Sequence, residues 1–328
     1  MSSIHFLNVG HGDCTVIEHD SGRITVIDCN NCEELDETSE SEVLKSLGPM
    51  ATLKYGAYRL ERFREAYALE KAGYSVPLTN PIEYLKSTLR VKSIFRYVQT
   101  HPDLDHMRGL SIVDREFSIG NFWDTDNEKS VEEYFRDSDE DDWKAYERLR
   151  TGTAPKILRL YRDSKGSFFN EGGSTTDLGD GLFIYAPTPE LVKAANERED
   201  WNELSYVLVL KEHGRTIVFG GDAGLDTWGD IYDAYDGKVK CDVLKASHHG
   251  RESGYHEEAV AAMHPGLTVV SVGKKPDTDA SDSYRKHSKF VWSTRWKGDV
   301  TVRIESSGLM TATSRCDNQP LTWKKLAA

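Results

Sequence analysis

Short apolar segments rich in β-branched residues alternate with helical patterns along most of the chain. The apolar runs are typical of strands, and polar turns such as Gly10–Asp13 and Asp20–Gly22 separate them. Helical patterns cover Arg59–Ala72, Pro81–Leu89 and Val131–Arg150, the second with proline at its first position. The expected strands are Ile4–Val9, Thr15–Glu18, Arg23–Asp28, Ser93–Gln99, Ile119–Trp123, Leu182–Ala186, Tyr206–Lys211, Thr216–Phe219, Asp242–Ala246, Thr268–Val272, Phe290–Ser293, Val300–Glu305 and Met310–Thr313.

The order of these elements predicts an α/β (α+β) architecture. Two β-rich halves with flanking helices indicate two mixed sheets packed face to face with helices outside. The length of 328 residues allows one or two domains, but no repeat or linker marks a boundary. We therefore expect a single domain over residues 1–328, with insertions at about 30–92 and 124–180.

Composition indicates a globular protein with no membrane span. Hydrophobic residues make up 38% and charged residues 29%, which is enough apolar surface for a core. No apolar run approaches the ~20 residues that a membrane helix needs, and no secretory signal is recognisable at the start. The five cysteines are scattered, in keeping with a reducing compartment. These features predict a cytoplasmic location.

The charge is acidic overall but uneven. The formal net charge of −13 argues against a protein that coats DNA non-specifically. Residues 274–328, however, hold eleven basic against six acidic residues. Within 274–297, the aromatic rings of Trp292 and Trp296 among these cations predict either a surface for phosphates and stacked bases or ordinary packing. A phosphodiester or nucleic-acid substrate therefore stays possible, and no protein partner is indicated.

The strongest chemical signal is the sequence His-Pro-Asp-Leu-Asp-His at 101–106, directly after an expected strand. In an extended segment its first histidine and both aspartates point the same way. Two imidazoles and two carboxylates packed together without a cation would leave buried charge uncompensated, which is costly. The alternative is a loop whose aspartates cap a helix starting near Met107. The motif predicts four metal ligands, namely His101, Asp103, Asp105 and His106.

Two further motifs follow apolar strands. Gly-Gly-Asp ends at Asp222, and Ser-His-His-Gly covers 247–250. Each could be an ordinary turn when considered alone. Adjacent histidines point to opposite sides of an extended chain, so only one of His248 and His249 reaches a given metal easily. We favour His248, which leaves the strand first, and keep His249 as the alternative.

Taken together, the motifs resemble the metallo-β-lactamase superfamily, whose usual signature is His-x-His-x-Asp-His. The aspartate at the third position is similar to the ComEC-like hydrolase branch, known from DNA-uptake machinery. The further motifs that carry the resemblance, in chain order, are Phe6–Asp13, Asn202–Leu208 with Gly220–Asp222, Asp242–Gly250 and Ser271–Lys274.

The resemblance implies an αββα sandwich with one or two divalent ions, zinc or manganese, at one edge. Asp105, His106, Asp222 and one of the two adjacent histidines would hold one ion. The other ion would share Asp222 and have only His101 and Asp103 as ligands of its own, which predicts weaker binding. Lys245 is either a phosphate ligand or an ion-paired strand residue. The catalytic candidates are Asp105, Asp103 and Lys245.

The same resemblance implies a metal-dependent hydrolase that uses a metal-activated hydroxide. A phosphodiesterase or nuclease is favoured; the alternatives are a small-molecule hydrolase (phosphoester, lactone or lactam) and a non-catalytic metal-binding subunit of a larger complex. The Gly-His-Pro that commonly follows the last motif is missing. The group that protonates the leaving oxygen is therefore unassigned, with His287 and Asp279 as weak candidates. Asp13 could contact the metal site or serve only the turn.

Overall fold

The computed structural model describes residues 1–31, 78–131, 137–172, 178–273 and 277–323. The expected helix Arg59–Ala72 and the start of the basic segment at Lys274 lie outside these residues. Among the described residues, none of the helices is both long and apolar enough to span a bilayer.

The first sheet has nine strands in the order β15-β14-β13-β1-β2-β3-β4-β5-β6. Strands β1, β2 and β3 form an antiparallel meander, and the pairs from β3 to β6 are parallel. Its strands are β1 Ser2–Phe6, β2 Thr15–Glu18, β3 Ile24–Ile27, β4 Ser93–Val98, β5 Ser118–Trp123, β6 Lys156–Leu158, β13 Val300–Ile304, β14 Met310–Ser314 and β15 Asp317–Trp323.

The second sheet has six strands in the order β12-β11-β10-β9-β8-β7. Strands β9 to β12 run parallel, and β7 and β8 are added antiparallel. Its strands are β7 Leu182–Ala186, β8 Val207–Glu212, β9 Arg215–Phe219, β10 Val243–Lys245, β11 Leu267–Val270 and β12 Phe290–Ser293.

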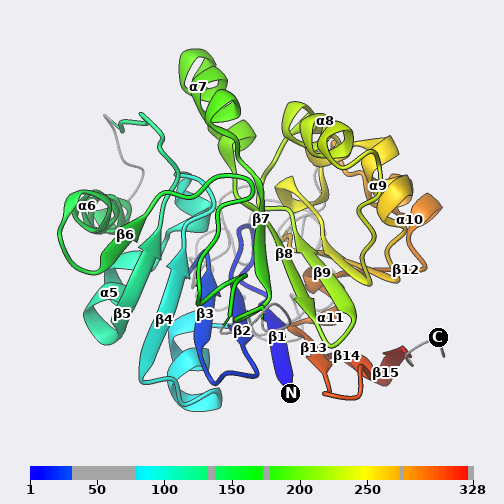
Figure 1. Cartoon of the computed structure of the whole chain (residues 1–328). Helices are drawn as coiled ribbons and strands as arrows, with labels where there is room; N and C mark the ends of the chain where they lie inside the picture. The colour runs from blue at the N-terminus through cyan, green and yellow to red at the C-terminus, as the bar shows by residue number, and fades with distance from the viewer. Residues whose placement is uncertain (32–77, 132–136, 173–177, 274–276, 324–328) are drawn as a thin grey trace, which may run out of the picture.

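The two sheets pack face to face around a buried apolar core. Phe6 and Val302 from the first sheet and Leu208 and Phe219 from the second belong to this central cluster. Helices cover the outer faces (Figure 1), and their apolar sides form two further clusters. The predicted αββα sandwich is confirmed. The described helices are α4 Pro81–Glu83, α5 Leu110–Glu116, α6 Asp137–Thr151, α7 Pro189–Arg198, α8 Leu225–Ala234, α9 Glu257–Met263, α10 Ser281–His287 and α11 Thr294–Lys297.

The structure corrects several element boundaries. Strands β6 and β15 were not expected, because neither is rich in the β-branched residues that mark a strand. The expected helix Pro81–Leu89 has one α-helical turn and then continues as a π-helix over Tyr84–Thr88. The segment after Met107 is not yet helical; a 3-10 turn covers Leu104–His106, and α5 starts at Leu110.

A buried ion pair links the first sheet to the segment that enters the second. Arg96 of β4 is 1% exposed, and its Nη2 lies 3.2 Å from Asp180 Oδ2, just before β7. Arg23 Nε donates to both carboxylate oxygens of Asp180 at 3.1 Å, and Ser21 Oγ donates to Oδ1 at 2.7 Å. The carboxylate therefore compensates two guanidinium groups in the interior.

Candidate metal centre

The chemistry-bearing loops follow β4 in the first sheet and β9 and β10 in the second. The loop after β4 is held by Gln99, whose Nε2 donates to the carbonyls of His101 and His106 at 2.9 and 3.2 Å. The loop after β9 turns at Gly221, where φ is +51° and a Cβ would lie 3.0 Å from the Tyr206 carbonyl oxygen. A glycine is therefore required to bring the following aspartate inward.

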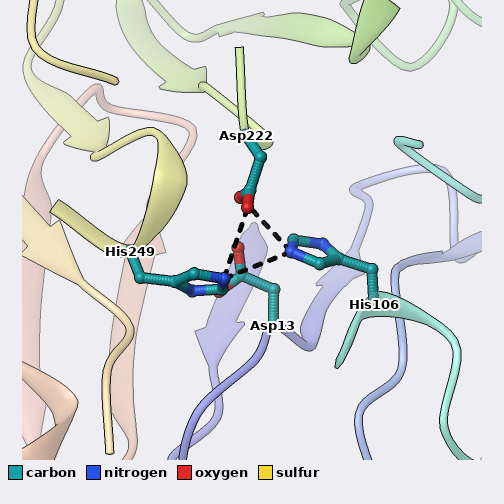
Figure 2. A group of neighbouring side chains, drawn as sticks. All are labelled: Asp13, His106, Asp222 and His249. Carbon is teal, nitrogen blue, oxygen red and sulfur yellow. Dashed lines mark hydrogen bonds and ion pairs between the residues drawn. The ribbon is translucent and has the colours of Figure 1, made fainter. Parts of the chain in front are cut away.

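Four buried side chains meet where these loops and the turn between β1 and β2 converge (Figure 2): Asp13, His106, Asp222 and His249. His106 Nε2 lies 3.2 Å from Asp222 Oδ1 and 3.4 Å from His249 Nε2, and His249 Nε2 lies 3.3 Å from Asp222 Oδ2. Ligands about 2.0–2.1 Å from a tetrahedral metal ion are about 3.3–3.4 Å apart. The triangle of donor atoms thus has the size of a metal site.

Hydrogen bonds behind the imidazoles turn their Nε2 atoms toward one another. His106 Nδ1 donates to Asp28 Oδ2 at 2.7 Å, and His249 Nδ1 donates to the Ser271 carbonyl oxygen at 3.1 Å. Because a carboxylate and a carbonyl only accept, each Nδ1 carries a proton. This leaves each Nε2 as the coordinating atom, the usual arrangement of a metal-binding histidine.

His101 is oriented in the same way. Its Nδ1 donates to Thr100 Oγ1 at 3.1 Å, because the Thr100 hydroxyl gives its own proton to Asp28 Oδ2 at 2.7 Å. His101 Nε2 is buried and has no hydrogen-bond partner among the described residues. It lies 3.6 Å from Asp103 Oδ2 and 3.9 Å from Asp222 Oδ2. A buried nitrogen in this position fits a ligand to a cation.

The electrostatics of the group favour positive charge at its centre. Burial opposes protonation of His249, but attraction by Asp222 and a hydrogen bond with Asp105 raise its pKa to about 10. For His106, Asp222 and Asp28 outweigh burial and raise the pKa well above its usual value. Burial raises the pKa of Asp222, but the two imidazoles outweigh it and hold that pKa well below the usual value. A divalent cation would supply this positive charge, so the residues fit a metal ion.

Asp13 and Lys245 form a buried ion pair next to the group. Lys245 Nζ, on a side chain 3% exposed, lies 2.7 Å from Asp13 Oδ2 and also donates to the Ala246 carbonyl oxygen at 3.2 Å. Of the two interpretations of Lys245, the structure shows the ion-paired strand residue. Asp13 Oδ1 is buried without a hydrogen-bond partner among the described residues. One oxygen of Asp13 lies within 4.8 Å of the donor atoms of His106, Asp222 and His249.

Asp105 contacts His249 and, with His11 and His249, forms a second group of possible ligand atoms. Its Oδ2 is 3.1 Å from His249 Nε2 and 3.8 Å from His11 Nε2, and its side chain is 22% exposed. Arg251 Nη2 contacts His11 Nε2 at 3.4 Å. Asp103 stands at the N-cap position of the 3-10 turn, but its side chain makes no capping hydrogen bond, and α5 begins only after Gly109. The capping alternative for the 101–106 motif therefore does not hold.

The structure reverses the preference between the two adjacent histidines. His249 faces the group, whereas His248 Nδ1 lies 2.7 Å from Ser253 Oγ at the surface. The expectation assumed an extended chain, but His248 and His249 have φ values of +47° and +52° in a tight turn. The alternation of strand side chains does not apply in that turn.

Asp28 was missed by sequence reasoning although it ends an expected strand. It is 1% exposed, and it accepts from His106 and Thr100 behind two histidines of the centre. Its backbone φ of +56° lies in the left-handed region, which asparagine also tolerates, so the backbone accepts asparagine at this position. The only sequence signal was its position at a strand end near the metal motif.

Asp28→Asn is expected to weaken binding of a divalent ion by about 10–100-fold, the usual cost of losing the residue that orients a histidine ligand. The neutral amide accepts more weakly from His106 Nδ1 and no longer stabilises positive charge at the centre. Competition with a fluorescent chelator would measure the affinity. An affinity equal to that of the wild type would show that Asp28 does not orient the ligand.

Comparisons with known proteins agree with the sequence motifs. No family model matches the chain. Over 130 residues the chain is 25% identical to ComE operon protein 3 of Bacillus subtilis (strain 168). The ComEC-like resemblance is confirmed. The match covers 38% of this chain and only 16% of that much longer relative.

Three solved structures resemble the chain more distantly. The CmlA β-hydroxylase E377D mutant is 10% identical with a TM-score of 0.47, and the alignment covers 92% of this chain and 54% of that one. A diphosphatase of the PhnP family is 9% identical with a TM-score of 0.41, covering 93% and 98%. Unliganded yeast PDE1 is 10% identical with a TM-score of 0.41, covering 89% and 98%. At such low identities and TM-scores, the similarity to these structures does not indicate the function of this chain.

Proposed function

We propose that the chain is a metal-dependent hydrolase of phosphodiester bonds, with nucleic acid as the favoured substrate class. The observation that carries the proposal is the triangle of His106 Nε2, His249 Nε2 and the Asp222 carboxylate, with sides of 3.2–3.4 Å. Asp105, at the solvent side of His249, completes the proposed ligand set. Zinc and manganese both suit imidazole and carboxylate ligands, and none of the proposed ligands among the described residues is a thiolate that would select zinc.

A divalent ion held there would supply hydroxide at neutral pH by lowering the pKa of water from 15.7 to about 7. Residues of the chain hold the ligands and the neighbouring carboxylate in place around the position of the ion. Asp28 and the Ser271 carbonyl fix the imidazoles, and Lys245 holds Asp13 in place. The Asp105 side chain is partly exposed, and we assign its carboxylate to orienting the attacking water.

Arg251 offers a cation for a phosphate. Its guanidinium contacts His11 at the rim of the centre, and its Nε is buried without a hydrogen-bond partner among the described residues. A guanidinium is suited to two parallel hydrogen bonds with phosphate oxygens. Arg251 is therefore the proposed anchor of the scissile phosphate.

The basic segment is divided between the two ends of β12. Because β10, β11 and β12 are parallel, Arg295 follows β12 at the end where the metal centre lies, and Lys289 precedes it at the opposite end. Trp292 is 7% exposed and belongs to the core, whereas Trp296 is 60% exposed with Arg295 over its ring at 5.1 Å. Among the described residues of the segment, the Arg295–Trp296 part is the proposed contact for a nucleic acid at the centre.

Arg251→Ala is expected to raise KM for a phosphodiester by about 10–100-fold with a smaller change in kcat, since hydrogen bonds to charged groups contribute about 1.5–3 kcal/mol. Steady-state kinetics on a chromogenic phosphodiester would measure this. Lys289→Ala removes the same charge at the opposite end of β12 and is expected to leave KM unchanged. Equal increases in KM for Arg251→Ala and Lys289→Ala would contradict a direct contact between Arg251 and the phosphate.

The proposed function is tested by hydrolysis of single- and double-stranded DNA, RNA and simple phosphodiesters with added Mn²⁺ or Zn²⁺. Cleavage of nucleic acid that depends on metal supports the proposal. Cleavage of small esters alone would favour the small-molecule hydrolase, which the net charge of −13 also suits. A bound metal ion without hydrolysis of any substrate would indicate the non-catalytic subunit.

A further inference from the structure

A lysine ammonium lies against the carboxylate where a second metal ion is expected. Lys129, in the loop between β5 and α6, places its Nζ 2.5 Å from Asp103 Oδ1. The side chains of Lys129 and Asp103 are 21% and 32% exposed, so this pair lies at the rim of the buried group. The resemblance assigns Asp103 to the second ion, but here one of its oxygens already has a cationic partner.

The loop that carries Lys129 is held by neighbouring residues. The Lys129 backbone N–H donates to Asn127 Oδ1 at 3.3 Å, and Asn127 is 4% exposed. Arg150 of α6 donates to Asn127 Oδ1 at 3.1 Å and to its carbonyl oxygen at 2.7 Å, and Asn127 Nδ2 donates to Tyr146 OH at 2.7 Å. The ammonium is therefore presented from an anchored backbone.

The donor atoms on this side are also more widely spaced. His101 Nε2 is 3.6 Å from Asp103 Oδ2 and 3.9 Å from Asp222 Oδ2, compared with 3.2–3.4 Å in the triangle around His106. Within the described part of the chain, neither His101 nor Asp103 belongs to a group of three ligand atoms that all lie within 4.8 Å of one another. The second ion does not fit this arrangement as the first one does.

The carboxylates on the two sides of the centre also differ in their ion-pair partners. Asp13 is paired with Lys245 and Asp103 with Lys129, whereas the ion pairs of Asp105 and Asp222 among the described residues are all with histidines. Two carboxylates therefore remain for a metal ion, and their combined charge matches a single divalent cation. A second divalent ion beside the ammonium would meet like-charge repulsion in a poorly solvated site.

We propose that the centre binds one divalent ion, held by Asp105, His106, Asp222 and His249, and that Lys129 supplies the positive charge in place of a second ion. The inference rests on the proposed function for the first ion. It makes Lys129 a residue that determines metal stoichiometry.

The test is the number of Mn²⁺ ions per chain after equilibrium dialysis of the full chain, measured by elemental analysis. Wild type is expected to hold one ion, and Lys129→Met is expected to hold two, because it keeps the length of the side chain and removes its charge. Lys129→Arg keeps the charge and is expected to hold one. Lys144→Met, at an exposed lysine of α6, is the matched control and is expected to hold one.

Electron paramagnetic resonance provides a second readout, since a spin-coupled Mn²⁺ pair is expected in Lys129→Met alone. Two ions in the wild type, or one ion in a folded Lys129→Met protein, would overturn the inference. If neither the wild type nor any variant binds an ion, the chain has no metal centre, and both the proposed function and the inference are overturned. One ion in the wild type and two in Lys129→Met without any hydrolysis would reject the hydrolase and support the role of Lys129.

Discussion

Replacing Asp222 by asparagine is expected to remove the bound divalent ion and to reduce hydrolysis by at least about a thousandfold while the chain stays folded. Asp222 is the carboxylate between both imidazoles, at 3.2 and 3.3 Å from their Nε2 atoms. Without its charge the ion is bound loosely, and the pKa of the nucleophilic water returns from about 7 toward 15.7. The amide has the same size, so the packing around this 3% exposed residue is kept.

Metal content and steady-state turnover, with circular dichroism to confirm folding, would measure the effect. Asp226→Asn, at an exposed carboxylate of α8 paired with Arg198, is the matched control and is expected to behave as the wild type. Asp105→Ala is also expected to abolish hydrolysis without unfolding the chain. Near wild-type turnover in either Asp222→Asn or Asp105→Ala would show that the proposed mechanism is wrong.

Asp180→Asn is expected to lower the free energy of unfolding by about 3–5 kcal/mol, the usual cost of removing one partner of a buried ion pair. Arg96 is 1% exposed, and Asp180 Oδ2 lies 3.2 Å from its Nη2. Burial lowers the pKa of Arg96, and the attraction of Asp180 opposes this shift. A guanidinium is not deprotonated in proteins, so Arg96 keeps its charge when its partner is lost. The uncompensated charge then destabilises the folded chain.

Urea unfolding would measure this loss. Adding Arg96→Met to Asp180→Asn removes the unpaired charge and is expected to restore part of the stability, because apolar replacements of both partners are often tolerated. Glu116→Gln, at a surface carboxylate paired with Lys86, is expected to leave the free energy of unfolding close to that of the wild type, because exposed ion pairs contribute little. A double variant no more stable than Asp180→Asn alone would contradict the role of the charge.

The architecture and much of the site could be predicted because short-range signals carry them. Apolar β-branched runs predicted thirteen of the fifteen strands that the described residues form, including Thr15–Glu18 with its observed boundaries. The structure brings His106 and Asp222, widely separated in the chain, to 3.2 Å from each other. Each motif followed a strand, and the packing of two sheets brings such strand ends to a common edge.

The site features that the sequence did not predict depend on tertiary geometry, which no local sequence pattern contains. The turn that selects His249 over His248 needs two consecutive left-handed residues, which an extended-chain argument does not produce. Asp28 acts through His106, 78 positions away in the chain. Lys129 reaches Asp103 from an inserted segment, where a single lysine among acidic residues carries no signal of its own.

The metal centre joins the two layers of the sandwich. His106 comes from the loop after β4 of the first sheet, whereas Asp222 and His249 follow β9 and β10 of the second. The unfolded chain has no such site, so ion binding and folding are thermodynamically linked. A free ion concentration 100 times the dissociation constant would stabilise the folded chain by about 2.7 kcal/mol. Stripping the ion with a chelator is therefore expected to lower the melting temperature, and Asp222→Asn should abolish that response.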